Sequence, residues 1–430
     1  MGLSFDRLYS TLVADEEDHG CRELPEDACR EVPGNAARVV AGQSLQGLGD
    51  KIIDPKTVLV WLLNGLGAPA AAVGLLVPIR ESGSLIPQAA MVPLVRRFGL
   101  RKLVWVAGAI GQALAAVGIG IVALTTDGAA AAVLILAALA VFALSRSLTS
   151  IASKDVLGKT IPRGNRGAVT GIAASVAGVG TLVLGAVLGA LSDASSTTVL
   201  ALIAAGASLL WLAAAATFVT IKEVPSPGDE SDPTATILEA LALVRDDRPF
   251  RHFLIARALL FVTALSPPFI VSLSASRTEA NLAGLGVFVV AGGVAGILGS
   301  PVWGRLADRS SRLVMTYAAG GGGLVVAVFL GFWWAGARSI WLGPAAYLVL
   351  ALLHTGSRMG RKTYVVDLAR GDRRTSYVAV ANTLTGLILL GTGAISAAAA
   401  QIGEEWALLG LAIVGLIGAR VAFSMEEIHQ

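Results

Sequence analysis

Apolar residues along the chain are gathered into twelve runs separated by polar stretches. A helix needs about 20 apolar residues to cross the hydrocarbon core of a bilayer, and these runs are close to that length. A spanning segment must satisfy its own backbone hydrogen bonds, so each run is predicted to be a helix. The predicted helices cover residues 36–63, 70–95, 103–124, 129–151, 168–191, 198–221, 250–275, 280–303, 313–335, 340–357, 376–400 and 406–423. The pattern therefore predicts an all-α polytopic membrane protein with twelve transmembrane helices.

A polar segment divides these runs into two sets of six. It opens with several prolines, and its residues 234–244 place apolar side chains at helical spacing, which predicts an interfacial helix. The expected organisation is a cytoplasmic tail, a six-helix bundle, a cytoplasmic linker, and a second six-helix bundle with a short tail. These parts cover residues 1–35, 36–221, 222–251 and 252–430.

The two halves resemble each other. A shift of 212 positions places Gly74 on Gly286 and Arg97 on Arg309. Two parallel six-helix repeats form a recurrent transporter plan, in which the site lies between the halves near the middle of the membrane. We therefore expect two pseudo-symmetric bundles with a central cavity.

Composition supports a membrane protein. The chain is 55% hydrophobic and 15% charged, whereas soluble domains average about 45–50% and about 25%. The net charge of +3 argues against a nucleic-acid partner.

We find no phosphate-binding loop, convincing metal cluster or nucleophile elbow, so neither an enzyme nor a cofactor is expected. Cys21, Cys29 and His19 lack the spacing of a zinc site, and we expect reduced thiols.

Lysine and arginine indicate the orientation. One set of loops holds most of them, at residues 96–102, 154–166, 305–312 and 358–374, whereas the alternate loops hold only Arg277 and Arg338. Basic loops face the cytoplasm, which places both termini and the linker there. We expect a multi-pass protein of the cell (inner) membrane, without a cleavable signal peptide.

The first two predicted helices carry charges near their middles, where ionisable groups are costly and are usually paired or functional. These charges are Asp50, Lys51, Asp54, Arg80 and Glu81. In an antiparallel hairpin Lys51 lies level with Glu81, and Asp50 lies roughly level with Arg80. The hairpin therefore predicts two contacts between opposite charges.

Three interpretations of these charges remain open, and they can overlap. They can form a structural network that locks the two helices together. Glu81 or Asp50 can couple transport to protons, because a carboxylate whose cationic partner moves is a natural proton switch. Arg80 or Lys51 can bind an anionic substrate directly. Arg146 in the fourth helix and His354 in the tenth are further candidates to face the cavity.

Prolines predict breaks within two helices. The pair Asp54–Pro55 interrupts the first, and residues 266–268, which include two prolines, interrupt the seventh at the corresponding place. A break frees backbone carbonyls, which is tolerated where they line a cavity. Both helices are therefore predicted to be gating elements.

One loop carries a recognisable signature. The run GRLADRSSR at residues 304–312 resembles the G-x-L-a-D-r-x-G-r-k loop motif of the major facilitator superfamily, at the position after the eighth helix where that family has it. The corresponding run in the first half, LVRRFGLRK at residues 94–102, matches at Gly99 and the basic residues. It departs from the motif at Arg96, where the family has an acidic residue. The resemblance covers about residues 36–423.

The resemblance implies a gate. Asp308 would lie near the N-terminus of the eleventh helix, where the helix dipole favours an anion, and would contact Arg373 or Arg374 to hold the outward-facing state. Because Arg96 replaces the equivalent acid, we expect an asymmetric gate. The gating set comprises Gly304, Asp308, Arg309, Arg312, Arg96, Arg97, Gly99, Arg373 and Arg374.

The favoured function is secondary active transport of a small solute by alternating access, coupled to protons. Export is favoured slightly over import, because Gly178, Gly185 and Gly189 in the fifth helix faintly resemble the antiporter motif of the superfamily. The expected partners are the lipid bilayer, the solute and protons, and the protein is expected to be a monomer. The alternative is a non-transporting membrane sensor or assembly factor on the same fold, with the acidic tail as its partner surface.

Overall fold

The computed structural model describes residues 26–88, 91, 95, 97–162, 165–191, 196–225, 244–276, 281–337, 339–368 and 374–427. The helices of the first half are α2 (Glu26–Arg30), α3 (Val32–Ile52), α4 (Val58–Gly65), α5 (Ala70–Leu85), α7 (Arg101–Thr125), α8 (Gly128–Thr160), α9 (Arg166–Ala190), α10 (Ser196–Gly206) and α11 (Ser208–Val219). Those of the second half are α13 (Arg248–Leu259), α14 (Val262–Ala275), α15 (Leu282–Arg309), α16 (Ser311–Trp334), α17 (Leu342–Leu368), α18 (Arg374–Ala400) and α19 (Glu404–Phe423).

These helices make the twelve predicted passes, since α3 with α4, α10 with α11 and α13 with α14 each form one pass. Within the described residues, nine spans are long and apolar enough to cross a membrane. The other three passes are α3 with α4, α5, and α17. The first is broken, α5 is short, and α17 carries several basic residues.

The break in the first pass lies where the sequence predicted it. Pro55 has no backbone N–H, and α3 ends at Ile52. The Asp54 carboxylate accepts hydrogen bonds from the backbone N–H of Lys56, at 2.7 Å, and from the Thr57 hydroxyl, at 3.4 Å. Asp54 thereby stabilises the turn between the two helices.

The break in the seventh pass is displaced from its predicted position. Pro267 and Pro268 lie inside α14, and the helix is interrupted earlier, between Leu259 and Val262. A proline ring clashes with the carbonyl four residues before it. The distortion therefore falls on the N-terminal side of the prolines, and the prediction of a break at residues 266–268 was wrong.

Two predicted loops are helical. Residues 304–309 belong to α15, and the short connection after them is Ser310, whose hydroxyl caps α16 by accepting from the Leu313 N–H at 3.1 Å. The tenth pass continues to Leu368 instead of ending at residue 357. Arg358, Arg361 and Lys362, which the sequence placed in a loop, therefore stand on α17.

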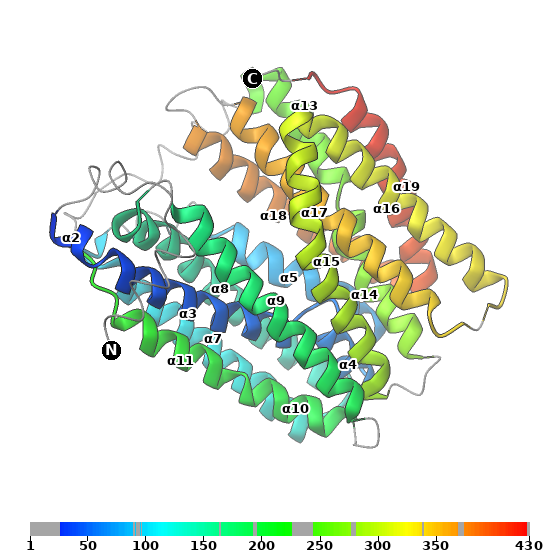
Figure 1. Cartoon of the computed structure of the whole chain (residues 1–430). Helices are drawn as coiled ribbons and strands as arrows, with labels where there is room; N and C mark the ends of the chain where they lie inside the picture. Colours follow the sequence, from blue (N-terminus) through cyan, green and yellow to red (C-terminus); the bar gives the residue numbers. More distant parts are fainter. Residues whose placement is uncertain are drawn as a thin grey trace.

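The two halves share their hydrophobic core at one end only. One cluster of buried residues draws on both halves, including α4, α5, α14 and α15. Two smaller clusters near α2 and the last turns of α19 are confined to the first and the second half respectively. We call the end with α2, the start of α7 and the end of α19 the basic end. Figure 1 shows the halves meeting near α4 and α14 and spreading apart towards the basic end.

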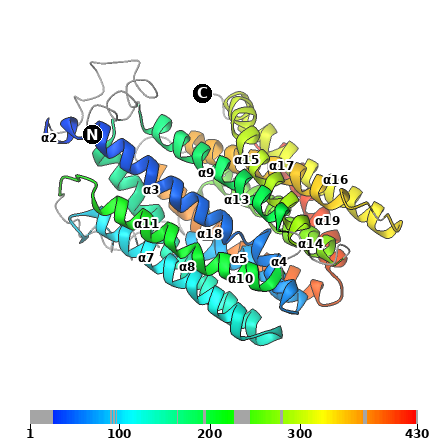
Figure 2. The ribbon, with the colours of Figure 1, turned by 60° about the horizontal axis from the view of Figure 1, so that its bottom comes forward.

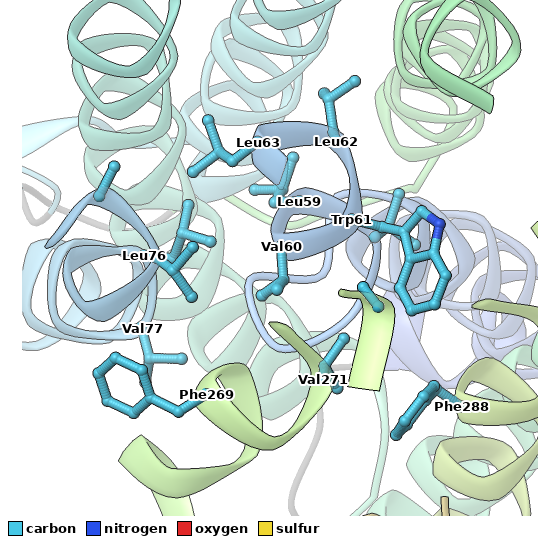
Figure 3. Packing of buried hydrophobic residues seen from close by; sticks show 14 of the residues in the cluster. Leu59, Val60, Trp61, Leu62, Leu63, Leu76, Val77, Phe269, Val271 and Phe288 are labelled. Atoms are coloured by element: carbon cyan, nitrogen blue, oxygen red, sulfur yellow. The ribbon is translucent and has the colours of Figure 1, made fainter. Parts of the chain in front are cut away.

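The shared cluster forms an apolar seal. Trp61 of α4 lies against Phe288 of α15, with ring centroids 6.2 Å apart. Val77 of α5 lies beside Phe269 of α14, and Leu76 of α5 belongs to the same cluster (Figure 3). Because the first and second halves interdigitate here, the seal closes the end opposite the basic loops.

Small residues let two pairs of helices pack closely across the halves, α9 with α15 and α5 with α18 (Figure 2). A Cβ atom on Gly286 would lie 2.6 Å from the carbonyl oxygen of Gly185, so neither position has room for a side chain. Close approach of backbones through small residues is the usual packing device inside membranes. Gly185 of α9 therefore has a packing role.

Several expectations concern other parts of the chain. Cys29 is disulfide-bonded, so the expectation of reduced thiols was wrong for that residue; composition and spacing do not reveal the redox state of a thiol. The predicted interfacial helix, most of the acidic tail and Cys21 lie outside the described residues, as do Arg277 and Arg338.

Candidate functional site

Asp50 is held by two arginines from its own half. Its Oδ1 lies 3.1 Å from Nη2 of Arg80 on α5, and its Oδ2 lies 2.9 Å from Nε of Arg146 on α8. Gln112 of α7 donates a third hydrogen bond to Oδ1 at 3.4 Å. The Asp50–Arg80 contact has the register that the hairpin predicted, and Arg146 completes a bridge among three helices.

Neighbouring polar groups extend this network inside the first half. Gln46 of α3 donates to Gln112 Oε1 at 2.9 Å and to Thr149 Oγ1 at 3.0 Å. Arg146 Nη1 also donates to Thr149, at 3.2 Å. The Arg80 guanidinium lies over the Phe142 ring, 4.9 Å from its centroid. Every described partner of Asp50 therefore belongs to the first half.

Glu81 is the next residue after Arg80 and points in another direction, because successive residues of a helix are about 100° apart. The charged groups that act on it are Lys56 and Arg80 of the first half, and Arg358 and Arg361 of the second. Among the described residues, no ion pair within 4.0 Å joins Glu81 to a basic group. Glu81 therefore lies between cations of both halves without being locked to one.

Lys51 does not pair with Glu81 as the hairpin register predicted. It is exposed, and its charge acts on Lys56 and His354. Successive residues of a helix are about 100° apart, so Lys51, which still lies within α3, points to a different side from Asp50. Lys56 replaces Lys51 as the nearby lysine.

The second half contributes one face of α17. His354, Arg358 and Arg361 recur at helical spacing and therefore share a face. His354 Nδ1 lies 3.2 Å from Oγ1 of Thr263 on α14, whereas Arg358 is exposed. Arg361 donates from Nε to the carbonyl of Ser357, in its own helix, at 3.0 Å. The charges of both arginines act on Glu81 of the first half, and within the described residues neither arginine is bonded to a carboxylate.

These residues form what we call the charged cluster: Lys51, Asp54, Lys56, Glu81, Arg358 and Arg361. A second link between the halves lies beside it. Arg257 of α13 is buried and donates from Nη2 to Asn382 Oδ1 of α18 at 3.0 Å. Asn382 in turn lies 3.5 Å from Gln88 of the first half.

The gating set is only partly described. Arg96 and Arg373 lie outside the described residues, as do the side chains of Asp308 and Arg374, so the latch predicted for Asp308 stays a prediction of the sequence. Arg97 and Arg309 are exposed, and Gly304 lies within α15. Arg312 instead bonds within its half, from Nε to Glu427 Oε2 at 2.7 Å and from Nη1 to the Phe423 carbonyl at 2.8 Å.

The first half has a matching contact at the basic end. The Glu223 carboxylate, just after α11, accepts from the backbone N–H groups of Arg101 and Lys102 at 3.0 and 2.8 Å. Lys159 Nζ lies 2.8 Å from the same carboxylate and 3.5 Å from the carbonyl of Gly99. An acid after the sixth pass of each half therefore ties that pass to the third.

A model of the Major Facilitator Superfamily matches residues 39–388. The chain belongs to the major facilitator superfamily. Its fold agrees, since superfamily transporters are built as two six-helix halves. No curated protein matches the chain in sequence.

Solved structures support the same fold. A POT family transporter in complex with a thioalcohol-conjugated peptide superposes with a TM-score of 0.72 at 11% identity, covering 94% of this chain and 98% of that one. The inward-open xylose transporter XylE from E. coli gives 0.69 at 11%, covering 92% and 97%. The nucleoside transporter NupG gives 0.67 at 13%, covering 91% and 98%. At these identities the similarity establishes the superfamily fold alone.

Sequence reasoning missed Lys56, Arg358 and Arg361 as site residues. For the arginines a signal was present, because they follow His354 at intervals of one and two helical turns. Ending the tenth helix at residue 357 hid that periodicity. Lys56 stands in the helix break, where its distance from Glu81 depends on how the broken helix bends.

Proposed function

We propose that this protein is a secondary transporter that moves a small solute across the membrane by alternating access, with the charged cluster on the solute path and Glu81 as the proton-coupling group. The observation that carries the proposal is that the cations around Glu81 come from both halves. Membership of the superfamily supports the transport class.

Alternating access can couple proton binding to transport, because it changes the distance between Glu81 and the cations of the other half. Lys56 and Arg80 belong to the same half as Glu81 and stay with it when the halves rock. Arg358 and Arg361 belong to α17 and change their distance from Glu81. Nearby cations favour the ionised carboxylate, so the proton affinity of Glu81 changes with the conformation. Such a group takes up a proton on one side of the membrane and releases it on the other.

Asp50 has a different role in this proposal. Its two ion pairs and its glutamine contact lie within the first half, so rocking of the halves leaves them intact. We assign Asp50, Arg80 and Arg146 to the structural network, which was one of the three interpretations of the hairpin charges.

The proposed orientation follows the basic residues. We place the protein in the inner membrane of the cell, with its basic end facing the cytoplasm. The apolar seal around Trp61 and Phe288 then faces the outside of the cell. The described conformation is in that case inward-facing. Export rested on the α9 glycines, whose contacts with α15 are explained by packing, so the proposal names no direction.

The proposal is tested with proteoliposomes and an unselected solute mixture. The purified full chain is reconstituted, the vesicles are loaded with a bacterial metabolite extract, and a pH gradient is imposed. Mass spectrometry then identifies solutes that redistribute only when the protein is present. We expect at least one solute to redistribute with the gradient, and Glu81→Gln to exchange it without accumulating it.

Glu426→Gln is the matched control, because Glu426 is an exposed glutamate at the basic end. It should behave as the wild type does. If no solute redistributes, the transport proposal is wrong, and the result supports the alternative of a non-transporting membrane sensor. If redistribution occurs but ignores the pH gradient, or if Glu81→Gln still accumulates the solute, the coupling proposal is wrong.

A further inference from the structure

We propose that the charged cluster binds an anionic solute, whose carboxylate or phosphate group is held between Arg358 and Arg361 of α17 and Lys56 of the first half. The inference rests on the proposed transport function and names its substrate class. It follows from charge balance, access and geometry.

The cluster holds more positive than negative charge. Lys51, Lys56, Arg358 and Arg361 are its four cations, and Asp54 and Glu81 are its two carboxylates. The Asp54 carboxylate is already engaged by the backbone of the helix break. Asp50, nearby, is neutralised by its own two arginines. Four positive charges against two negative ones leave the cluster with a net charge of +2 even when both carboxylates are ionised.

These cations are accessible and act on one another. Lys51 and Arg358 are exposed, and Lys56 and Arg361 are half-buried. The charge of Arg358 opposes those of Lys56 and Arg361. Within the described residues, none of the four has a carboxylate within 4.0 Å. Like charges held together raise the energy of the free protein, and a bound anion relieves that repulsion.

The donor types suit a carboxylate or phosphate. A guanidinium offers a planar fork that binds two oxygens of either group, whereas a lysine ammonium acts as a point charge. Arg358 and Arg361 lie one turn apart on one side, and Lys56 lies on the opposite half. An anion between them bridges the two halves, so its binding favours their closure at the basic end. A cationic solute would be repelled from the same place.

Glu81 competes with the anion for the same cations. The charged groups that face Glu81 are Lys56 from the helix break, Arg80 from its own helix, and Arg358 and Arg361 from α17, where His354 stands among the same cations. When Glu81 is protonated, the competing negative charge is gone and the anion binds more tightly. Proton and anion are therefore expected to bind together, which is the linkage that symport requires.

The test is a thermal-stability screen of the detergent-purified full chain at constant ionic strength. The anionic probes are succinate, citrate, glycerol 3-phosphate, inorganic phosphate and sulfate, and the controls are xylose, uridine and choline. A ligand at about 100 times its Kd stabilises a protein measurably. We expect at least one carboxylate or phosphate probe to raise the unfolding temperature, and to bind more tightly at low pH than at neutral pH.

Variants localise the effect. Arg358→Gln and Arg361→Gln should each weaken the binding of that probe about tenfold or more, the worth of one charge-assisted hydrogen bond. Arg358→Lys should retain part of the affinity, and it keeps the test valid if the glutamine variant unfolds. Arg420→Gln, which alters an exposed arginine in the last turn of α19, should bind as the wild type does.

The outcomes separate this inference from the transport proposal. If no anionic probe stabilises the protein, or if only xylose, uridine or choline does, the anionic class is wrong while transport can stand. If the anion binds and needs Arg358 but never crosses the membrane of proteoliposomes, the site stands and transport is wrong. If Arg420→Gln weakens binding as much as Arg358→Gln does, the binding reflects nonspecific charge attraction and the proposed site is wrong.

Discussion

Asp50 and Glu81 are two carboxylates of the same hairpin with opposite surroundings. Both oxygens of Asp50 are bonded to arginines of its own half, at 3.1 and 2.9 Å. Glu81 has no such ion pair among the described residues, and its cationic neighbours are divided between the halves. On the proposed mechanism, a carboxylate whose partners all lie in its own half is structural, whereas one whose cationic neighbours are divided between the halves senses conformation.

The same distinction applies to uncharged contacts. Under the proposed alternating access, contacts inside one half persist and contribute to the stability of the fold. Contacts between the halves that are made in only one conformation set the balance between conformations. Four substitutions distinguish these two kinds of contact.

Asp50→Asn should have the largest effect, on stability. The substitution leaves the Arg80 and Arg146 guanidinium groups without their shared counter-ion. Breaking a largely buried ion pair by removing one partner costs about 3 kcal/mol or more. We expect a clear fall in the unfolding temperature in detergent, and Asp50→Asn combined with Arg146→Gln should recover part of it. An unchanged unfolding temperature in the single variant would contradict the structural role.

Gly286→Ala should act on the balance between conformations. Its Cβ would lie 2.6 Å from the Gly185 carbonyl oxygen and would push α9 and α15 apart. Overpacking of this kind costs about 1–3 kcal/mol, here in the described conformation. Distances measured between spin labels on the two halves should shift towards other conformations.

Gly296→Ala is the matched control for Gly286→Ala. Both glycines lie within α15, and a Cβ on Gly296 meets nothing within 4 Å. The control should leave the distances unchanged. Equal shifts in the two variants would mean that the effect arises from the helix and not from its contact with α9.

Ser272→Ala should have a smaller effect of the same kind. Asn64 of α4 donates to the Ser272 hydroxyl at 3.1 Å across the halves, and that hydroxyl lies 2.6 Å from Glu404 Oε1 of α19. A hydrogen bond is worth about 1 kcal/mol, or roughly a fivefold change in a population ratio. The sealed conformation should lose population by about that factor.

Ser396→Ala controls for the loss of a buried hydroxyl. Both serines are 5% exposed, but the hydrogen bond that Ser396 makes among the described residues is to the Thr392 carbonyl of its own helix, at 2.9 Å. The control should leave the spin-label distances as they are in the wild type. If Ser396→Ala moves the populations as far as Ser272→Ala does, the link through Asn64 does not set them.

Glu81→Gln should change stability least. No ion pair within 4.0 Å is broken in the described conformation, so the free energy of unfolding should change by less than about 1 kcal/mol, in the range of other weakly paired side chains. Thermal unfolding alongside Asp50→Asn provides the measurement. A loss of stability equal to that of Asp50→Asn would place Glu81 in the structural network as well.

Much of the fold could be predicted from the sequence, because apolar runs near 20 residues leave little choice but transmembrane helices. The internal repeat predicted two related six-helix halves, and the basic loops predicted which ends of the helices lie on the same side of the membrane. The hairpin register also predicted the Asp50–Arg80 contact, since Asp50 precedes the end of α3. The same register did not predict the surroundings of Lys51, although Lys51 also lies within α3.

The charged cluster could be predicted only in part, because its geometry depends on where helices break and end. The sequence predicted Lys51 as the lysine near Glu81, but that lysine is Lys56, which stands in the turn that Asp54 stabilises. Arg358 and Arg361 belong to the charged cluster because α17 continues beyond residue 357 and carries them on the same face as His354. Contacts between halves depend on the packing of helices that are distant in sequence, and single-sequence patterns carry no record of that packing.

The most direct test of the central claim is the pH dependence of the distance between the halves. Spin labels at L103C and Y317C, exposed positions near the basic ends of α7 and α16, would be measured in full-length protein with Cys21→Ser and Cys29→Ser. We expect that lowering the pH redistributes the distances in the wild type and in Glu426→Gln, but not in Glu81→Gln. If Glu81→Gln responds to pH as the wild type does, Glu81 does not couple protons to conformation.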